Sequence, residues 1–422
     1  MPVKNTRQFN ISDHNNFKYK MLNWVKQFNI SCFLDNNNYD SPSFECLLAV
    51  AKDQYIELTA GKAYHLLQQF HEQHPGWLFG HFAYDLKNED PSLYSRHENH
   101  INFPDAFFFS PEILITINAG IITIQGDFPE NVYKEIIETE ISPSNNVIPA
   151  IQQLTSKKEY IDTFNKLIEH IHRGDCYEIN FCQEFYIQQC IIDVVEIYLK
   201  LINVSPNPFS ALYRINDKFC LCASPERYLM KKGQLLVSQP IKGTSKRFSN
   251  KALDENSFEE LKQSGKDKSE NVMIVDLVRN DLSRICERNS VKVTSLFEIK
   301  KFPQVYQMIS TVEGIMKNRH WTEAIKATFP MGSMTGAPKK KVMQLIELYE
   351  KSNRGLFSGS IGYVTPEGDF DFNVVIRSIF YNNSNQYLSF MAGGGITANS
   401  DGENEYEECL MKVKAIVEIL SD

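Results

Sequence analysis

The sequence predicts an α+β fold, in which amphipathic helices accompany mostly antiparallel strands. Short β-branched and aromatic runs, separated by Asn, Asp, Gly and Pro, fill the first third of the chain. Beyond them, segments with helical spacing are mixed with hairpin-like strand pairs, which argues against a doubly wound parallel sheet. With 42% apolar and 12% aromatic residues among 422, the chain can bury a large core.

The composition argues against nucleic-acid-binding, disulfide-rich and membrane proteins. The chain has 44 Lys and Arg against 52 Asp and Glu, a net charge of −8, which argues against a nucleic-acid-binding surface. Its nine cysteines form no C-x-x-C pair, so we expect reduced thiols in a cytoplasm and neither disulfides nor a zinc site. No apolar run approaches the roughly 18 residues of a membrane span, and the polar N-terminus lacks a signal peptide. We therefore expect a cytoplasmic protein with no membrane role.

A polar, Pro-containing stretch at 141–150 suggests a boundary between two subregions. The first, 1–147, is rich in strands and shows no catalytic motif. The second, 148–422, contains four predicted helices. Ser156 and Glu159 form a capping box that begins the first helix, and Gly174 suits its C-terminal end. The other three are predicted at 267–285, 338–351 and 404–420.

Three glutamates on two of these helices suggest a metal site. Glu405, Glu408 and Lys412 share one face of the last helix, and Glu270 lies along an apolar stripe of the helix at 267–285. A buried, unpaired carboxylate is costly, and a hard divalent cation such as Mg²⁺ would offset that cost. The alternatives are a salt bridge from Glu270 to a nearby lysine and an ordinary solvated face on the last helix.

The segment 331–341, MGSMTGAPKKK, suggests an anion site. Ser333 and two glycines precede a helix that carries Pro338 in its first turn, and the N–H groups at a helix N-terminus favour an anion. Neither a Walker A loop nor G-x-G-x-x-G is present, so nucleotide binding has no support and a carboxylate is the better candidate. An ordinary capped helix is the alternative.

Further polar and glycine-rich motifs surround predicted strands. Arg377 falls in an alternating strand predicted at 371–380, where it is either exposed or a bidentate clamp for a carboxylate. Three glycines at 393–395 interrupt a later strand, as a bulge or a close approach to a ligand would require. Lys242 is held between Pro240 and Gly243 at a strand end. None of these motifs establishes chemistry by itself.

Taken together, the motifs resemble those of the chorismate-utilising enzymes, and most closely the aminodeoxychorismate synthases of the 4-aminobenzoate and folate branch. The resemblance runs from about 157 to the C-terminus through SPERY, PIKGTSKR, DKSENVMIVDLVRNDLSR, FPMGSMTGAPKKK, GSIGYV, DFNVVIRS, GGGITANSD and ENEYEECLMK. It implies a four-layer α/β/β/α body with two largely antiparallel, orthogonally packed sheets and the active site between them.

The resemblance also implies a role for each candidate residue. Magnesium, held by Glu270, Glu408 and, through water, Glu405, would bind the ring carboxylate of chorismate together with Ser333. The implied contacts to the rest of the substrate, including the enolpyruvyl carboxylate, come from Gly243, Thr244, Tyr363, Arg377, Gly393, Gly394 and Lys412.

In the implied mechanism Glu226 is the general acid that protonates the departing 4-hydroxyl, and Lys242 is the nucleophile that attacks C2. A nucleophilic amine must be neutral, so this role predicts a lowered pKa for Lys242. The alternative is a charged Lys242 that only neutralises the substrate.

Three positions distinguish branches of the family. Lys242 lies in PIKGT, where anthranilate synthases have PIAGT, which favours amination at C4. Gln307 replaces the histidine associated with pyruvate elimination, and Glu178 replaces the lysine that activates water in isochorismate synthases. The alternatives are anthranilate synthase component I and a catalytically silent chorismate-binding subunit.

The nitrogen donor also follows from the resemblance. No cysteine lies in a Gly-x-Cys-x-Gly elbow, so ammonia would come from solution or from a separate glutamine amidotransferase subunit.

Overall fold

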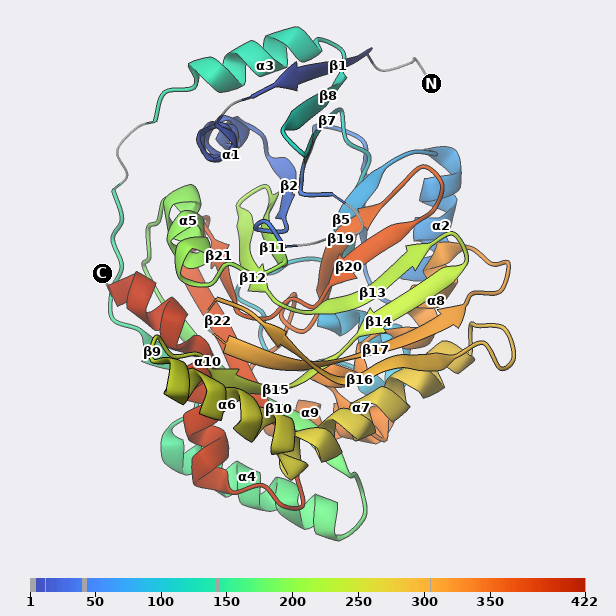
Figure 1. Ribbon diagram of the computed structural model, residues 1–422, viewed down its shortest axis with the longest axis vertical. Helices are drawn as coiled ribbons and strands as arrows, with labels where there is room; N and C mark the ends of the chain where they lie inside the picture. Colours follow the sequence, from blue (N-terminus) through green and yellow to red (C-terminus); the bar gives the residue numbers. More distant parts are fainter. Residues whose placement is uncertain (1–4, 12, 40–43, 142–144, 304, 422) are drawn as a thin grey trace.

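Two large antiparallel sheets form the centre of the protein (Figure 1). The computed structural model describes the whole chain except residues 1–4, 12, 40–43, 142–144, 304 and 422. Both sheets have helices on their outer faces, so the predicted α+β fold with four α/β/β/α layers is confirmed.

Within the described residues, the larger sheet has 12 strands. Along its main path the strands are β1 (Asn5–Asn10), β8 (Ile121–Gly126), β7 (Ile113–Asn118), β3 (Cys46–Ala51), β2 (Ile30–Asp35), β11 (Phe209–Ile215), β12 (Lys218–Ser224), β21 (Ser378–Asn382), β22 (Tyr387–Thr397), β10 (Glu178–Ile187) and β18 (Gly336–Ala337), and β9 (Gln152–Gln153) pairs with β10.

The smaller sheet has 10 strands in the part of the chain that the structure describes. In order they are β15 (Ile241–Lys246), β17 (Val305–Ile315), β14 (Leu235–Gln239), β13 (Arg227–Lys232), β20 (Phe370–Asn373), β19 (Ser360–Val364), β5 (Leu78–Phe82), β6 (Ala106–Phe109) and β4 (Tyr55–Leu58), and β16 (Lys292–Lys301) pairs with β17. Strands from both predicted subregions share both sheets; β2 pairs with β11, for example. The 1–147 and 148–422 division therefore stays a prediction, and part of its expected boundary, 142–144, lies outside the described residues.

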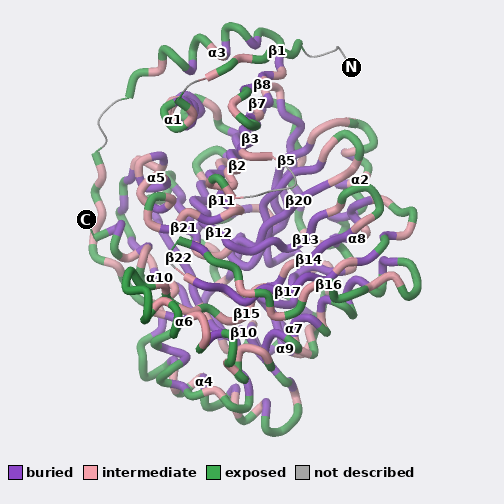
Figure 2. The backbone as a smooth tube through the Cα atoms, in the orientation of Figure 1, coloured by how far each residue is buried: buried purple, intermediate pink, exposed green. Residues whose placement is uncertain are grey.

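Helices cover the outer faces of the two sheets. Those associated with the larger sheet are α1 (His14–Trp24), α3 (Pro129–Glu138), α4 (Lys157–His172), α5 (Val194–Val204), α9 (Lys339–Tyr349) and α10 (Gly402–Ser421). Those associated with the smaller sheet are α2 (Ala63–Gln73), α6 (Lys251–Gln263), α7 (Gly265–Ser283) and α8 (Trp321–Thr328). Figure 2 shows that the buried stretches follow the central strands, whereas α3 and α4 are exposed along much of their length.

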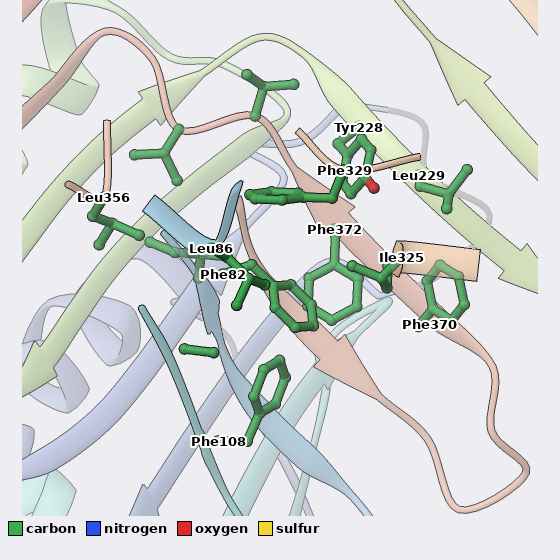
Figure 3. Close-up of a cluster of buried hydrophobic side chains, with 14 of the residues drawn as sticks. Phe82, Leu86, Phe108, Tyr228, Leu229, Ile325, Phe329, Leu356, Phe370 and Phe372 are labelled. Carbon is green, nitrogen blue, oxygen red and sulfur yellow. The ribbon is translucent and has the colours of Figure 1, made fainter. Parts of the chain in front are cut away.

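The core is rich in aromatic side chains. Phe82, Phe108, Phe329 and Phe372 pack together with aliphatic residues between α8 and the smaller sheet (Figure 3). All nine cysteines are buried and free in this structure. No helix within the described residues combines the length and apolar character needed to cross a membrane.

The four predicted helices of the second subregion are present with small shifts. The capping box of Ser156 and Glu159 begins α4, and Gly174 follows it with φ of 85°. Helix α7 begins two residues before the predicted position, because Ser264 caps it by accepting from the N–H of Asp267. Pro338 is the N-cap of α9, and is not in its first turn.

Two strand predictions were wrong. The predicted strand at 371–380 is divided, since β20 ends at Asn373 in the smaller sheet and β21 begins at Ser378 in the larger one. Arg377 is therefore at a crossing between sheets, with φ of 51°, and is not in an alternating strand. Conversely, the glycines at 393–395 do not interrupt β22, which pairs with β10 in continuous register through all three.

Candidate active site

The candidate site lies where β10 and β22 of the larger sheet meet β15 of the smaller sheet. The side chain of Lys242 on β15 is only 10% exposed, and its Nζ donates to Glu178 Oε1 of β10 at 2.7 Å. Burial by itself would lower the pKa of Lys242, but the carboxylates of Glu178 and Glu270 outweigh it and raise that pKa above its ordinary value. The lowered pKa predicted for a nucleophilic Lys242 is therefore not found.

Glycines form the wall behind these side chains. A Cβ on Gly395 would lie 2.8 Å from both Glu178 Oε1 and Lys242 Nζ. A Cβ on Gly394 would lie 2.9 Å from Glu405 Oε2, and Lys412 donates to the carbonyl oxygen of Gly393 at 2.8 Å. The run of three glycines thus brings β22 close to the charged groups without a bulge.

Glu226 is a buried carboxyl group in the connection between β12 and β13. Its backbone N–H donates to the hydroxyl of Ser224, and its carbonyl oxygen accepts from Val374 N–H at 3.0 Å. Burial raises the pKa of its carboxyl to about 7, against the opposing effects of a hydrogen bond from Ser333 and the charges of Lys242 and Arg377. A carboxyl group with this pKa carries a proton in a large fraction of molecules at neutral pH.

The loop that carries Ser333 is held firmly. Asn180 of β10 donates through Nδ2 to the carbonyl oxygen of Ser333 at 2.9 Å, and Arg354 donates to that of Met334 at 2.7 Å. Gly336 pairs with Ile179, so part of the loop is a short strand of the larger sheet. Ser333 is consequently fixed beside Glu226.

The three predicted metal ligands lie on α7 and α10 and are partly neutralised by lysines. Lys266 Nζ is 2.9 Å from Glu405 Oε1 and 3.8 Å from Glu270 Oε1, while Lys412 Nζ is 2.8 Å from Glu408 Oε1. The salt bridge considered as the alternative for Glu270 is therefore present. The described residues include no group of three or more His, Cys, Asp or Glu side chains already arranged for a metal.

These carboxylates nevertheless fit a divalent cation. Glu270 Oε1 is buried without a hydrogen-bond partner, and burial raises the pKa of its carboxyl to about 7 despite the positive charges of Lys242 and Lys266. A carboxylate in this state gains from a further cation.

Three of the predicted substrate contacts lie close to Glu226 or Lys242, and a fourth packs against aromatic side chains. The charge of Arg377 acts on Glu226, while its guanidinium makes no hydrogen bond or ion pair with the described residues and so can bind an anion. Gly243 and Thr244 directly follow Lys242 on β15, with φ of 92° at Gly243. The ring of Tyr363 packs instead against Phe44, Trp77 and Phe79, and its contact with substrate stays a prediction.

Sequence reasoning missed two charged partners. Lys266 precedes Glu270 by four residues, a spacing that brings side chains together on a helix and that could have identified the pair. Glu178 was considered only as a replacement for a lysine, and its contact with Lys242 spans 64 residues and two sheets.

An α+β body with buried carboxylates, a buried lysine and a free guanidinium defines a protein that binds a small anionic molecule. The family model described as chorismate binding enzyme matches residues 32–418, and the chain belongs to this family.

Proteins with similar sequences include aminodeoxychorismate synthases, and a solved structure with a similar fold is an anthranilate synthase component I. Aminodeoxychorismate synthase component 1 of Escherichia coli is 33% identical over 351 residues, covering 82% of this chain and 77% of that protein. The probable chloroplastic aminodeoxychorismate synthase of Oryza sativa is 39% identical over 272 residues, which cover 63% of this chain and only 30% of the rice protein. The crystal structure of anthranilate synthase component I from Streptococcus pneumoniae aligns with a TM-score of 0.78 at 24% identity, over 90% of this chain and 93% of that one, and this likeness concerns the fold alone.

Proposed function

We propose that the protein aminates chorismate at C4 with ammonia and produces 4-amino-4-deoxychorismate for 4-aminobenzoate and folate synthesis. The observation that carries this proposal is the burial of Lys242 and Glu226 together, at the positions where aminodeoxychorismate synthases have the lysine of PIKGT and a general acid. The similarity to synthases of this name in bacteria and plants supports it.

The proposed reaction uses Lys242 as the nucleophile. Its amine attacks C2, the ring double bonds shift, and the C4–O bond breaks as Glu226 donates its proton to the departing hydroxyl, which leaves as water. Ammonia then adds at C4, the double bonds return, and the C2–N bond to Lys242 breaks. Arg377 holds the enolpyruvyl carboxylate, and Ser333 holds the ring carboxylate.

Magnesium is the proposed cofactor, and Glu270, Glu405 and Glu408 are its proposed ligands. When bound, it would neutralise the ring carboxylate of chorismate and hold it in place. The unpaired oxygen and raised pKa of Glu270 support this assignment.

A separate glutamine amidotransferase subunit is the proposed source of ammonia. The designation of the bacterial relatives as component 1 supports a second component. The nine reduced thiols are consistent with the proposed cytoplasmic location.

Incubation with chorismate, Mg²⁺ and an ammonium salt, followed by mass spectrometry and NMR of the product, tests the function. Aminodeoxychorismate is the expected product. Anthranilate would instead indicate an anthranilate synthase, and unchanged chorismate with measurable binding would indicate a catalytically silent subunit.

The variant Lys242→Arg tests the role of the lysine. It keeps the positive charge but is expected to lose activity, because a guanidinium is a poor nucleophile.

A further inference from the structure

Glu178 and Lys242 form a hydrogen-bonded ion pair that is largely shielded from solvent. Their side chains are 1% and 10% exposed, and Glu178 Oε1 is the only hydrogen-bond partner of Lys242 Nζ among the described residues. The strand that carries Glu178 is held on both sides, since this residue pairs with Thr397 of β22 and with Ala337 of β18. The carboxylate therefore has little freedom to leave the amine.

A nucleophilic Lys242 needs a group that removes its proton. The carboxylates around this lysine favour its ammonium form, and solvent has little access to it. We propose that Glu178 is a catalytic residue of the amination, the base that accepts the proton of Lys242 as its amine attacks C2 of the substrate. This inference rests on the proposed function.

Other carboxylates face Lys242 but are less suited to this role. Glu226 from the β12–β13 connection, Glu270 from α7 and Glu408 from α10 all interact with it electrostatically. None of them is within hydrogen-bond distance of Nζ, whereas Glu178 lies at 2.7 Å. Moreover, Glu178 Oε2 is buried and has no hydrogen-bond partner among the described residues, so no other group holds this oxygen. Both the position and the surroundings of Glu178 therefore suit a proton acceptor.

The protons and electrons balance over the cycle. The Lys242 ammonium and Glu178 carboxylate become an amine and a carboxylic acid, and the lone pair of Nζ forms the C2–N bond while Glu226 protonates the leaving hydroxyl. When ammonia adds at C4, the C2–N bond breaks and its electron pair returns to Nζ. Glu178 then returns its proton to Lys242, and Glu226 takes a proton from the new C4 ammonium. The sum is chorismate plus ammonia giving aminodeoxychorismate plus water.

Formation of the covalent adduct without ammonia tests the inference. The protein is mixed with chorismate and Mg²⁺, quenched at intervals, and the peptide containing Lys242 is followed by mass spectrometry. At pH 7 we expect Glu178→Gln to form the adduct at least about 100-fold more slowly than wild type. We expect the rate of this variant to rise about tenfold per pH unit from 7 to 9, because the lysine must lose its proton to solvent. Wild type should change much less over this range.

Two further variants separate a base from a merely structural contact. Glu178→Asp retains a carboxylate and should recover part of the rate with a flat pH profile. Glu184→Gln changes another buried glutamate of β10 and should react at the wild-type rate. A Glu178→Gln rate within threefold of wild type, or a slowing that is the same at every pH, would overturn the inference.

Failure of the inference is distinguishable from failure of the function. If wild type aminates chorismate but forms no adduct, Glu178 is not a base for a nucleophilic lysine, although the proposed function survives. If wild type produces no aminodeoxychorismate at all, both are overturned.

Discussion

The ammonium group of Lys266 lies between two predicted metal ligands, 2.9 Å from Glu405 Oε1 and 3.8 Å from Glu270 Oε1. Glu405 is fully buried and Glu270 nearly so, whereas the side chain of Lys266 is 45% exposed. The lysine can therefore move into solvent while the carboxylates stay in place. It neutralises the same charge that a divalent cation would neutralise, so a cation bound at the proposed site would compete with Lys266 for these oxygens.

We expect Lys266→Gln to bind divalent cations more tightly than wild type, by several-fold in Kd. Removal of the ammonium leaves a more negative pair of carboxylates for the incoming ion. Isothermal titration with Mg²⁺, or electron paramagnetic resonance with Mn²⁺, measures the affinity without chorismate.

Lys262→Gln is the matched control, because Lys262 is on the neighbouring helix α6 and its ion pair is with the exposed Glu259, which is not a predicted metal ligand. It should bind the ion as wild type does. Equal or weaker binding by Lys266→Gln would contradict the competition.

Glu226→Gln should abolish amination and yet stabilise the unliganded protein at pH 8. Burial raises the folded-state pKa of this carboxyl from 4.5 to about 7, so the folded protein retains a proton that the unfolded chain has already lost. Stability is lost as the pH rises through this window, and an uncharged Gln avoids the loss. We expect a gain of about 1–3 kcal/mol at pH 8 and little gain at pH 4.5. Urea unfolding of both proteins at the two pH values measures it, and a gain independent of pH would argue against a buried titrating group.

Arg377→Lys should be nearly as damaging to catalysis as Arg377→Ala. The guanidinium has no partner among the described residues, and a single ammonium cannot reproduce a bidentate contact with a carboxylate. The KM for chorismate should rise at least about tenfold in both variants, consistent with the loss of a charge-assisted hydrogen bond of about 1.5–3 kcal/mol. Steady-state kinetics provide the measurement, and a wild-type KM in Arg377→Lys would exclude the clamp.

The predictable parts of this fold depend on local signals. The caps and apolar spacing of α4 are contained within a few residues, so Ser156, Glu159 and Gly174 were sufficient to predict its ends. The break between β20 and β21 has no such signal. Its backbone is held by distant groups, since Val374 N–H donates to Glu226 and Val375 N–H donates to Gly359.

The site residues, too, could be predicted where the signal was local and not where distant elements determine their surroundings. Glu405 and Glu408 could be paired on one face from their spacing, and the resemblance to a family supplied Glu226 and Lys242. The environment of Lys242 could not be predicted, because the pKa of a lysine depends on the carboxylates that other elements bring to it.

The pairing of Lys242 with Glu178 leads to the last prediction, which concerns stability and does not depend on the substrate. Lys242→Met removes the only described hydrogen-bond partner of Glu178 Oε1 and leaves a buried carboxylate without its cation. Such a loss costs about 3–5 kcal/mol, whereas removal of both charges together is close to neutral. We therefore expect the double variant Lys242→Met/Glu178→Gln to unfold in urea nearly as wild type does, and Lys242→Met alone to be strongly destabilised.

The exposed pair Lys262 and Glu259 is the control for this prediction. The corresponding double-mutant cycle should give a coupling free energy below about 0.5 kcal/mol. Additive effects of the two substitutions at 242 and 178 would show that the two side chains do not form a coupled buried pair in solution.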